Sequence, residues 1–528
     1  MNHWIIAPVV LPALVAPLII MVMRHHLDLQ RIFSVAATVA LNAIALVLLA
    51  QAMTGDVQIY ELGNWPAPFG IVLVLDRLSA LMVLLTALLG LAVVLYAIGS
   101  GWDRRGRHFH ALVQFQLMGV VGAFLTGDAF NLFVFFEVLL IASYGLMIHA
   151  GGGRRLAAGV QYVVYNLLGS TLFLFALGTL YAVTGTLNMA DLAVKVAQLP
   201  ADDTALIRVG AVLLLLVFAI KAAVLPLHFW LPASYANAPL PVAALFAIMT
   251  KVGAYAILRV YTLVFGPDVA ATQGLVGDWL LPAAVITLAV GSIGILGAKQ
   301  IGRLMAFGAI ASMGTLLIAI ALFTPQATAA ALYYMLHSTL AAALVFLVAD
   351  LVMERRGDAI DPHRPMPQIG LIASLYFIGA IALAGMPPLS GFLGKLLVMD
   401  AARDAGAPWS IWAVILISSL ITIIGLARAG AILFWKAYDP DFVREPHDQA
   451  EPHDQAEPHA DPDEIVQLDP DEPAPDPMPG LSFVAVFGLV VGLVALTVFA
   501  GPVMRFADAT AQQLFAPDAY IQSVLKGQ

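Results

Sequence analysis

The sequence predicts an all-α polytopic membrane protein with about fourteen transmembrane helices. Of its 528 residues, 61% are hydrophobic and only 11% are charged, whereas soluble chains average about 25% charged residues. Apolar windows recur along nearly the whole chain, and each is long enough to cross a bilayer as a helix. Lys and Arg gather in alternate connections between these windows, which sets the topology of the bundle.

The predicted spans follow the apolar windows in order. Their limits are 4–23, 32–53, 78–98, 109–127, 129–149, 159–183, 205–225, 240–262, 279–298, 302–323, 327–352, 370–386, 409–435 and 481–502. Residues 387–400 are expected to continue the twelfth span after a break.

The basic residues test this set of spans independently. Connections after odd-numbered spans carry Arg24, Arg31, Arg104, Arg105, Arg107, Arg154, Arg155, Lys299, Arg303, Arg355, Arg356, Arg364, Lys436 and Arg444. The other side carries half as many: Arg77, Lys195, Arg208, Arg259, Arg403, Arg505 and Lys526. Because an excess of Lys and Arg marks the cytoplasmic side, both termini are predicted to lie on the outer side.

Two spans contain residues that break helices. These are Pro226 and Pro232 in the seventh span, and Pro387, Pro388 and Gly391 in the twelfth. Proline removes a backbone hydrogen bond, and in lipid the freed groups need partners, so such backbone lines a cavity. Interrupted spans at matching places in two halves are typical of inverted repeats. We therefore expect two inverted five-helix repeats, spans 4–8 and 9–13; prolines that merely kink packed helices are the alternative.

Five titratable residues lie in mid-span: Glu137, Lys221, Lys251, His337 and Lys395. A charge at the bilayer centre costs roughly 2.5–3.5 kcal/mol, and such residues usually mark proton or ion pathways. Buried lysine can lose its proton whereas arginine stays charged, so the three lysines favour proton transfer over anion binding.

We expect Glu137 to pair with Lys221, whose charge then influences Lys251, with Lys395 as the matching element of the second half. A static ion pair is the alternative for Glu137 and Lys221. For His337 the alternative is a packing histidine that hydrogen-bonds a serine or threonine.

Other charged residues lie nearer the ends of spans. His149 and His228 are expected at the interface, Asp76, Asp128 and Asp350 at the surface or rim, and Arg428 within span 13 with its charge reaching toward the cytoplasm.

The organisation of the chain follows from these elements. The expected parts are helices 1–3 (1–108), the first repeat (109–262), the second repeat (279–436), a polar loop (437–479) and helix 14 with a tail (480–528). The loop repeats the hexapeptide EPHDQA, with His447, His453 and His459 between carboxylates. Metal capture is conceivable there, but a disordered acidic linker fits this composition better.

Motifs for nucleotide, redox or hydrolytic chemistry are absent from the sequence. It has no cysteine, no phosphate-binding glycine loop, no metal-ligand spacing and no nucleophile–base pattern. We therefore expect no cofactor and no enzymatic reaction, so that any energy source is an ion gradient or another protein of the same complex.

Residues 226–259, PLHFWLPASYANAPLPVAALFAIMTKVGAYAILR, resemble the signature segment of the antiporter-like, proton-pumping subunits of respiratory complex I and of Mrp-type cation/proton antiporters. The resemblance covers spans 4–13. It implies fourteen helices with two inverted five-helix repeats, and a gating pair formed by Glu137 and Lys221. Lys251 corresponds to the family's lysine of the eighth helix, and Lys395 to that of the twelfth.

Two departures favour the D-type subunits of Mrp antiporters over the subunits of complex I. Tyr235 stands where complex I relatives tend to have histidine, and Ala342 where many members have a lysine after the histidine of the eleventh helix. The link from Lys251 to Lys395 would then run through His337 and water.

The resemblance implies a subunit of a hetero-oligomeric Na⁺ (or K⁺)/H⁺ antiporter in the bacterial inner membrane. Such a subunit acts with companion subunits and binds no nucleic acid. A proton-pumping subunit of complex I or of a membrane-bound hydrogenase is the first alternative, and a non-transporting scaffold the second.

Overall fold

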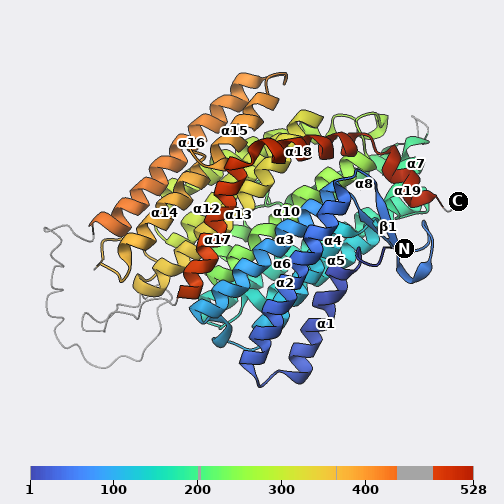
Figure 1. Ribbon diagram of the computed structural model, residues 1–528. Coiled ribbons are helices and arrows are strands. Elements are labelled where there is room, and N and C mark those ends of the chain that lie inside the picture. Colours follow the sequence, from blue (N-terminus) through green and yellow to red (C-terminus); the bar gives the residue numbers. More distant parts are fainter. Residues whose placement is uncertain (1, 200–203, 364, 437–479, 527–528) are drawn as a thin grey trace, which may run out of the picture.

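The computed structural model describes residues 2–199, 204–363, 365–436 and 480–526 (Figure 1). In its first half the helices are α1 (Ala7–Val22), α2 (Leu27–Ala52), α3 (Arg77–Ser100), α4 (Phe109–Leu125), α5 (Ala129–Met147), α6 (Gly153–Thr184), α7 (Met189–Ala197), α8 (Ala205–Lys221), α9 (Trp230–Asn237) and α10 (Leu240–Leu263). The second half contains α11 (Leu281–Gly297), α12 (Ile301–Ala321), α13 (Pro325–Arg356), α14 (Ile369–Ala384), α15 (Ser390–Ala401), α16 (Pro408–Gly430), α17 (Gly480–Val498), α18 (Ala500–Phe515) and α19 (Asp518–Leu525). One antiparallel hairpin joins β1 (Gln58–Glu61) to β2 (Val72–Leu75).

The predicted all-α membrane fold is confirmed. Within the described residues, 10 helices are long and apolar enough to cross a membrane, and α1, α4 and α14 are shorter apolar helices. With the broken helix α8–α9, every predicted span has a helical counterpart. The predicted continuation of the twelfth span is α15, which follows α14 after a break.

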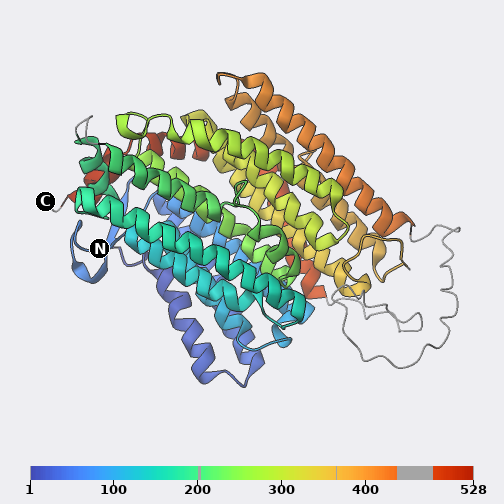
Figure 2. The ribbon, with the colours of Figure 1, turned by 180° about the vertical axis from the view of Figure 1, so that it is seen from behind.

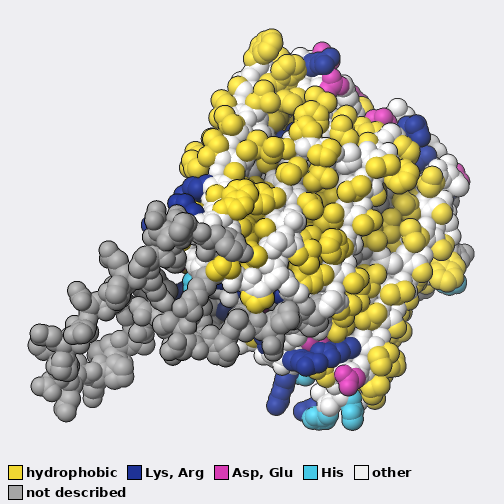
Figure 3. Space-filling model, turned by 60° about the vertical axis from the view of Figure 1, so that its left-hand side comes forward, with side chains coloured by type: hydrophobic (Ala, Val, Ile, Leu, Met, Phe, Trp, Pro, Cys, Tyr) yellow, Lys and Arg dark blue, Asp and Glu magenta, His cyan; other side chains and the backbone are white. Residues whose placement is uncertain are grey.

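The long helices run side by side, and the two labelled ends of the chain lie at the same end of the bundle (Figures 1 and 2). An even number of crossings requires this arrangement. Hydrophobic side chains cover the middle of the molecular surface, and charged side chains gather at its ends (Figure 3). This is the surface expected of a protein whose middle is solvated by lipid.

The centre of the bundle is formed by α10, α12 and α13. Their membrane-crossing windows are 100%, 94% and 94% buried, whereas those of α2, α16 and α17 are 33% buried. A helix that is apolar all round belongs in the middle of a bundle. Lys251 on α10 and His337 on α13 therefore lie far from lipid, on two helices that pack against each other.

Several elements outside the apolar windows were not predicted. They are the hairpin, the short helix α7, and the C-terminal helices α18 and α19, where the sequence indicated only a tail. Helix α18 crosses the end of the bundle and packs on α13, burying Ala507, Ala511 and Leu514 (Figure 1). The amphipathic helices α7, α18 and α19 carry too little continuous apolar sequence to be predicted as membrane spans.

The loop 437–479, predicted to be disordered, lies outside the described residues. The two broken helices, α8–α9 and α14–α15, occupy the fourth place in each predicted set of five. The relation of the two sets as inverted repeats stays a prediction.

Candidate functional site

Glu137 and Lys221 both bind to helix α6. The Ser170 hydroxyl donates to a carboxylate oxygen of Glu137 on α5, and the Lys221 ammonium on α8 donates to Asn166 Oδ1 at 3.0 Å. Asn166 and Ser170 lie four residues apart and so share one face of α6. None of the ion pairs within 4.0 Å in the described part of the chain joins Glu137 to Lys221. The direct pair expected from the sequence is therefore replaced by contacts through α6.

Lys221 is the last residue of α8, where the helix breaks. A cation is favourable at this end because the backbone carbonyls there carry partial negative charge. Protein groups bind part of the freed backbone: Trp230 Nε1 donates to the Ile220 carbonyl at 2.9 Å, and the Leu225 N–H donates to Thr287 Oγ1 at 2.9 Å. Pro226 thus lies in a break with defined partners, whereas Pro232 lies within α9.

Lys251 lies one helix further into the bundle. Its side chain is buried, and the described residues give its ammonium no hydrogen-bond acceptor and no carboxylate within 4.0 Å. Two residues later, Gly253 packs on the end of α8, where an added Cβ would lie 2.7 Å from the Ala222 nitrogen and 3.0 Å from Lys221 Cβ. The close approach of α10 to α8 brings the two lysine-bearing segments together.

His337 on α13 contacts the start of α15. Its Nδ1 and Ser390 Oγ form a hydrogen bond of 2.9 Å, and its side chain is 1% exposed. Ala342, five residues further along α13, is also buried, so no side-chain charge stands there. The serine partner matches the alternative of a packing histidine, and it equally fits a proton-transfer role.

Lys395 folds back across the α14–α15 break. Its ammonium donates to the carbonyl of Ala384, the last residue of α14, and to Ser419 Oγ on α16, both at 2.8 Å. Gly385 makes this possible, because an added Cβ would lie 2.7 Å from Lys395 Cδ. The residues Pro387 and Pro388 lie within this break.

Gly391 marks the tightest packing at the second break. A Cβ on this residue would lie 2.3 Å from the Ala382 carbonyl oxygen and 2.8 Å from His337 Nε2. We expect Gly391→Ala to push α15 away from α14 and His337, costing about 1–3 kcal/mol and lowering ion exchange. Gly370→Ala is the matched control, since nothing lies within 4 Å of its added Cβ. Equal thermal stability and exchange in the two variants would contradict this assignment.

The sequence therefore located the titratable residues but missed their partners. Asn166, Ser170, Ser390 and Ser419 bind them through neutral oxygens. The sequence did carry one signal for these partners: a small polar residue in the middle of an apolar span, such as Asn166 or Ser170. Such residues commonly form hydrogen bonds between membrane helices.

Several charges predicted at the surface are buried, so that prediction was wrong. Asp76 caps the start of α3 and pairs with Arg259, with Oδ2 2.6 Å from Nη1. Burial alone would raise the pKa of Asp76, but Arg259 and Ser79 hold that pKa below its ordinary value. Asp350 accepts hydrogen bonds from Tyr96 at 2.9 Å and Trp102 at 3.0 Å. Helices packed over the ends of these spans bury the carboxylates, which hydropathy does not reveal.

The other charged residues expected near the interface or snorkelling toward it differ in their exposure. Asp128, His149 and His228 are buried. Arg428 is exposed and donates to the Ala298 carbonyl at 3.1 Å. Burial lowers the pKa of His149, whose Nε2 lies 2.9 Å from the Trp102 carbonyl oxygen.

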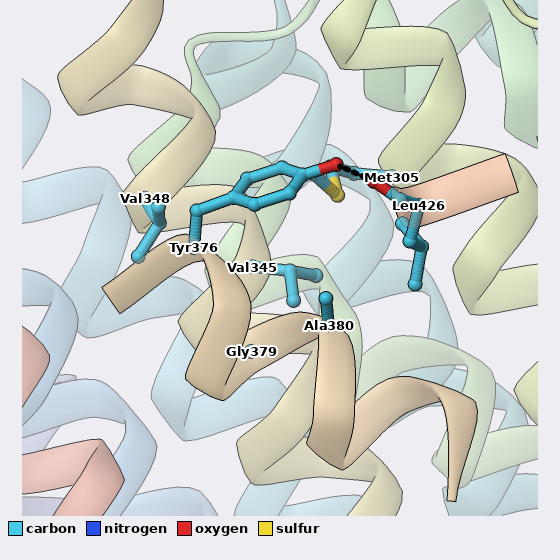
Figure 4. Close-up of a pocket in the computed structure, with 7 residues that line it drawn as sticks. All are labelled: Met305, Val345, Val348, Tyr376, Gly379, Ala380 and Leu426. Carbon is cyan, nitrogen blue, oxygen red and sulfur yellow. Dashed lines mark hydrogen bonds between the residues drawn. The ribbon is translucent and has the colours of Figure 1, made fainter. Parts of the chain in front are cut away.

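A small pocket between α12, α13, α14 and α16 is a packing gap. Met305, Val345, Ala380 and Leu426 are among its lining residues (Figure 4). Its one polar side chain, Tyr376, already donates to the Leu426 carbonyl at 2.9 Å, and the pocket has no room for a water molecule. Among the described residues, no group of three or more His, Asp or Glu could hold a metal ion.

Comparison with known proteins gives consistent similarities. Residues 126–422 match the family described as NADH:quinone oxidoreductase/Mrp antiporter, TM. The chain is 37% identical to the probable K⁺/H⁺ antiporter D-type subunit of Rhizobium meliloti, over 99% of this chain and 98% of that protein. It is 42% identical to the Na⁺/H⁺ antiporter D-type subunit of Bacillus subtilis, over 82% and 87% respectively.

Two solved structures extend the similarity to the fold. A chain of the Mrp complex from Dietzia sp. superimposes with a TM-score of 0.85 at 30% identity, covering 99% of this chain and 100% of that one. A chain of respiratory complex I from Thermus thermophilus gives 0.76 at 25% identity, covering 97% and 99%.

Proposed function

The chain belongs to the family of D-type subunits of Mrp cation/proton antiporters, and from that premise we propose that it translocates protons for a multisubunit Na⁺ (or K⁺)/H⁺ antiporter. Its route comprises Glu137, Lys221, Lys251, His337 and Lys395. We propose that the side of the bundle rich in Arg and Lys faces the bacterial cytoplasm and that both termini face outward.

One observation carries the proposal: the lysines at the two helix breaks are held by neutral oxygens. Lys221 donates to Asn166 Oδ1, and Lys395 donates to the Ala384 carbonyl and Ser419. Removing a proton from an ion-paired lysine leaves an uncompensated carboxylate, which is costly in a buried site. A neutral amine still donates to a carbonyl or hydroxyl, so these two sites can accommodate both protonation states.

Charge coupling orders the steps. A proton on Lys221 disfavours a proton on Lys251 by electrostatic repulsion, which is strong where water is excluded. Release of Glu137 from Ser170 would let its carboxylate approach Lys221 and stabilise the charged ammonium. Movement of that carboxylate would thus determine when Lys221 releases its proton toward Lys251, from which it continues to His337.

The alternatives differ in their energy source and in their need for these side chains. A redox-driven pump requires electron-carrying partners, whereas the relatives matched along most of their length are named as antiporter subunits of the D type. A scaffold protein requires none of the buried titratable groups, and it leaves the positions of Lys221 and Lys395 at the two helix breaks unexplained.

Exchange measured in vesicles tests the proposal. Inverted membrane vesicles containing the whole complex should dissipate an imposed pH gradient when Na⁺ or K⁺ is added, and comparison of the two salts identifies the ion. Choline chloride is the matched control for osmotic and ionic-strength effects. If the assembled complex shows no cation-dependent response with either ion, the antiporter assignment is wrong.

A further inference from the structure

Asp350 is a buried carboxylate near the Arg- and Lys-rich end of α13. It is 1% exposed, and it takes part in none of the ion pairs among the described residues. The other buried aspartates of the described chain have charged or backbone partners: Asp76 pairs with Arg259, Asp103 with Arg31 and His110, Asp191 with Lys195, and Asp128 accepts the Asn131 N–H. Burying the charge of a carboxylate is costly unless a cation offsets it, and a proton serves the same purpose.

Two neutral aromatic side chains hold the Asp350 carboxylate. The Tyr96 hydroxyl on α3 donates to Oδ2 at 2.9 Å, and Trp102 Nε1, in the turn after α3, lies 3.0 Å from Oδ1 and 3.1 Å from Oδ2. Both donors therefore reach Oδ2. A hydroxyl or an indole N–H binds a carboxylate and equally the carbonyl oxygen of a protonated acid. The site thus accommodates a proton on Oδ1 without loss of either donor.

The charged groups around Asp350 are bound elsewhere. Glu354, one turn further along α13, accepts both guanidinium nitrogens of Arg105, the longer contact being 2.7 Å. Arg155 and Arg355 donate to carbonyl oxygens. The side chain of Glu354 is 23% exposed, and residues four apart share one face of a helix. This face of α13 therefore carries a carboxylate that reaches water and, one turn deeper, a carboxylate that does not.

Tyr235 on α9 lies between Asp350 and Lys251. Its ring centre is 5.9 Å from that of Phe346, one turn before Asp350 on α13, and 5.8 Å from that of Phe246 on α10. Its hydroxyl donates to the Phe246 carbonyl at 2.8 Å. Because both phenylalanines contact one ring, they lie at about the same depth in the bundle. Lys251 follows Phe246 by five residues, so with a rise of about 1.5 Å per residue Asp350 lies roughly 14 Å from Lys251 along the bundle axis.

We propose that Asp350 transfers protons between the cytoplasmic surface and Lys251, along a path that passes Tyr235. This inference rests on the proposed function, because it adds a cytoplasmic entrance to that proton route. The Asp350 carboxylate takes a proton from water near Glu354 and becomes a neutral acid. The acid then gives that proton to the neutral amine of Lys251, which becomes an ammonium, and the carboxylate is restored. The Tyr235 hydroxyl and water molecules bridge the distance between the two groups.

A purely structural carboxylate is the alternative, in which Asp350 only fastens Tyr96 and Trp102 to α13. Asparagine separates the two roles. An amide oxygen at the position of Oδ2 accepts both hydrogen bonds, but an amide neither takes up nor releases a proton in the range of a carboxyl group. Glutamate has the opposite properties, since it keeps the carboxyl group and adds a methylene to a buried site, which strains the packing.

Exchange by the whole complex in inverted vesicles, whose cytoplasmic face meets the medium, tests the proposal. Asp350→Asn should assemble normally and lower cation-dependent proton exchange at least about tenfold, as expected when a group that transfers protons is removed. Asp350→Glu should be less stable to heat than Asp350→Asn and yet exchange faster. Asp28→Asn is the matched control, since it changes an aspartate whose side chain is 93% exposed, and it should leave exchange unchanged.

Full exchange in assembled Asp350→Asn would overturn the assignment, and so would equal loss in the asparagine and glutamate variants, which would indicate packing alone. Neither result bears on the proposed function, which fails if the wild-type complex shows no cation-dependent exchange.

Trp102→Phe provides a second measurement if Asp350→Asn does not assemble. Phenylalanine keeps a ring beneath Arg105, whose guanidinium lies 4.1 Å from the centre of the Trp102 ring, and it removes one hydrogen bond to the Asp350 carboxylate. Because the charged form loses a donor, the medium pH of half-maximal exchange should rise relative to the wild type. A pH profile that does not move would contradict the proposal.

Discussion

Cation-dependent proton exchange should fall roughly a hundredfold in Lys395→Ala, the loss typical when a group that transfers protons is removed. Lys395 is the only side chain that the described residues show bridging the end of α14 and Ser419 on α16. Alanine removes both the titratable group and the cation at the helix terminus. The measurement is exchange in vesicles, normalised to the amount of assembled complex. Lys221→Ala and Glu137→Gln should lower exchange similarly.

Arginine at position 395 separates proton transfer from mere charge. It keeps the cation but does not release its proton, so Lys395→Arg should be as inactive as Lys395→Ala. If Lys395→Arg retains exchange, the site needs only a positive charge. Lys436→Ala, which removes an exposed lysine, is the matched control and should keep full exchange. Full exchange in all the assembled relay variants would establish the scaffold alternative.

Arg259→Ala should destabilise the folded protein by about 3–5 kcal/mol, because it leaves Asp76 charged and buried. The pair is 2% and 4% exposed at its two side chains. Arg259 also lies 5.3 Å from the centre of the Tyr520 ring on α19, so its loss should loosen the C-terminal helices. Thermal inactivation and the yield of assembled complex measure the effect.

Two further variants make that prediction specific. Lys195→Ala breaks a partly exposed pair with Asp191 and should cost no more than about 0.5 kcal/mol. The double variant Asp76→Asn/Arg259→Leu removes both charges and should recover part of the stability lost in Arg259→Ala, since no lone charge is left buried. Wild-type stability of Arg259→Ala would show that the pair is not a stabilising element.

Hydropathy and charge determined the broad architecture of this protein. Lipid requires every span to be helical and apolar, so composition alone predicts the fold class and the approximate spans. The same constraint makes Glu137, Lys221, Lys251, His337 and Lys395 conspicuous, since ionisable residues are rare in such segments. Proline and glycine likewise marked the two helix breaks, because their backbone effects are local.

Only the tertiary structure decided what surrounds these residues. Asn166 and Ser170 on α6 replace the expected direct contact of Glu137 with Lys221, and Lys395 binds the end of α14 together with α16. Burial of Asp76 by Arg259 likewise joins residues 183 positions apart. Hydropathy reports how each helix meets lipid, but a hydrogen bond between helices depends on which faces pack together, and that is a property of the assembled bundle.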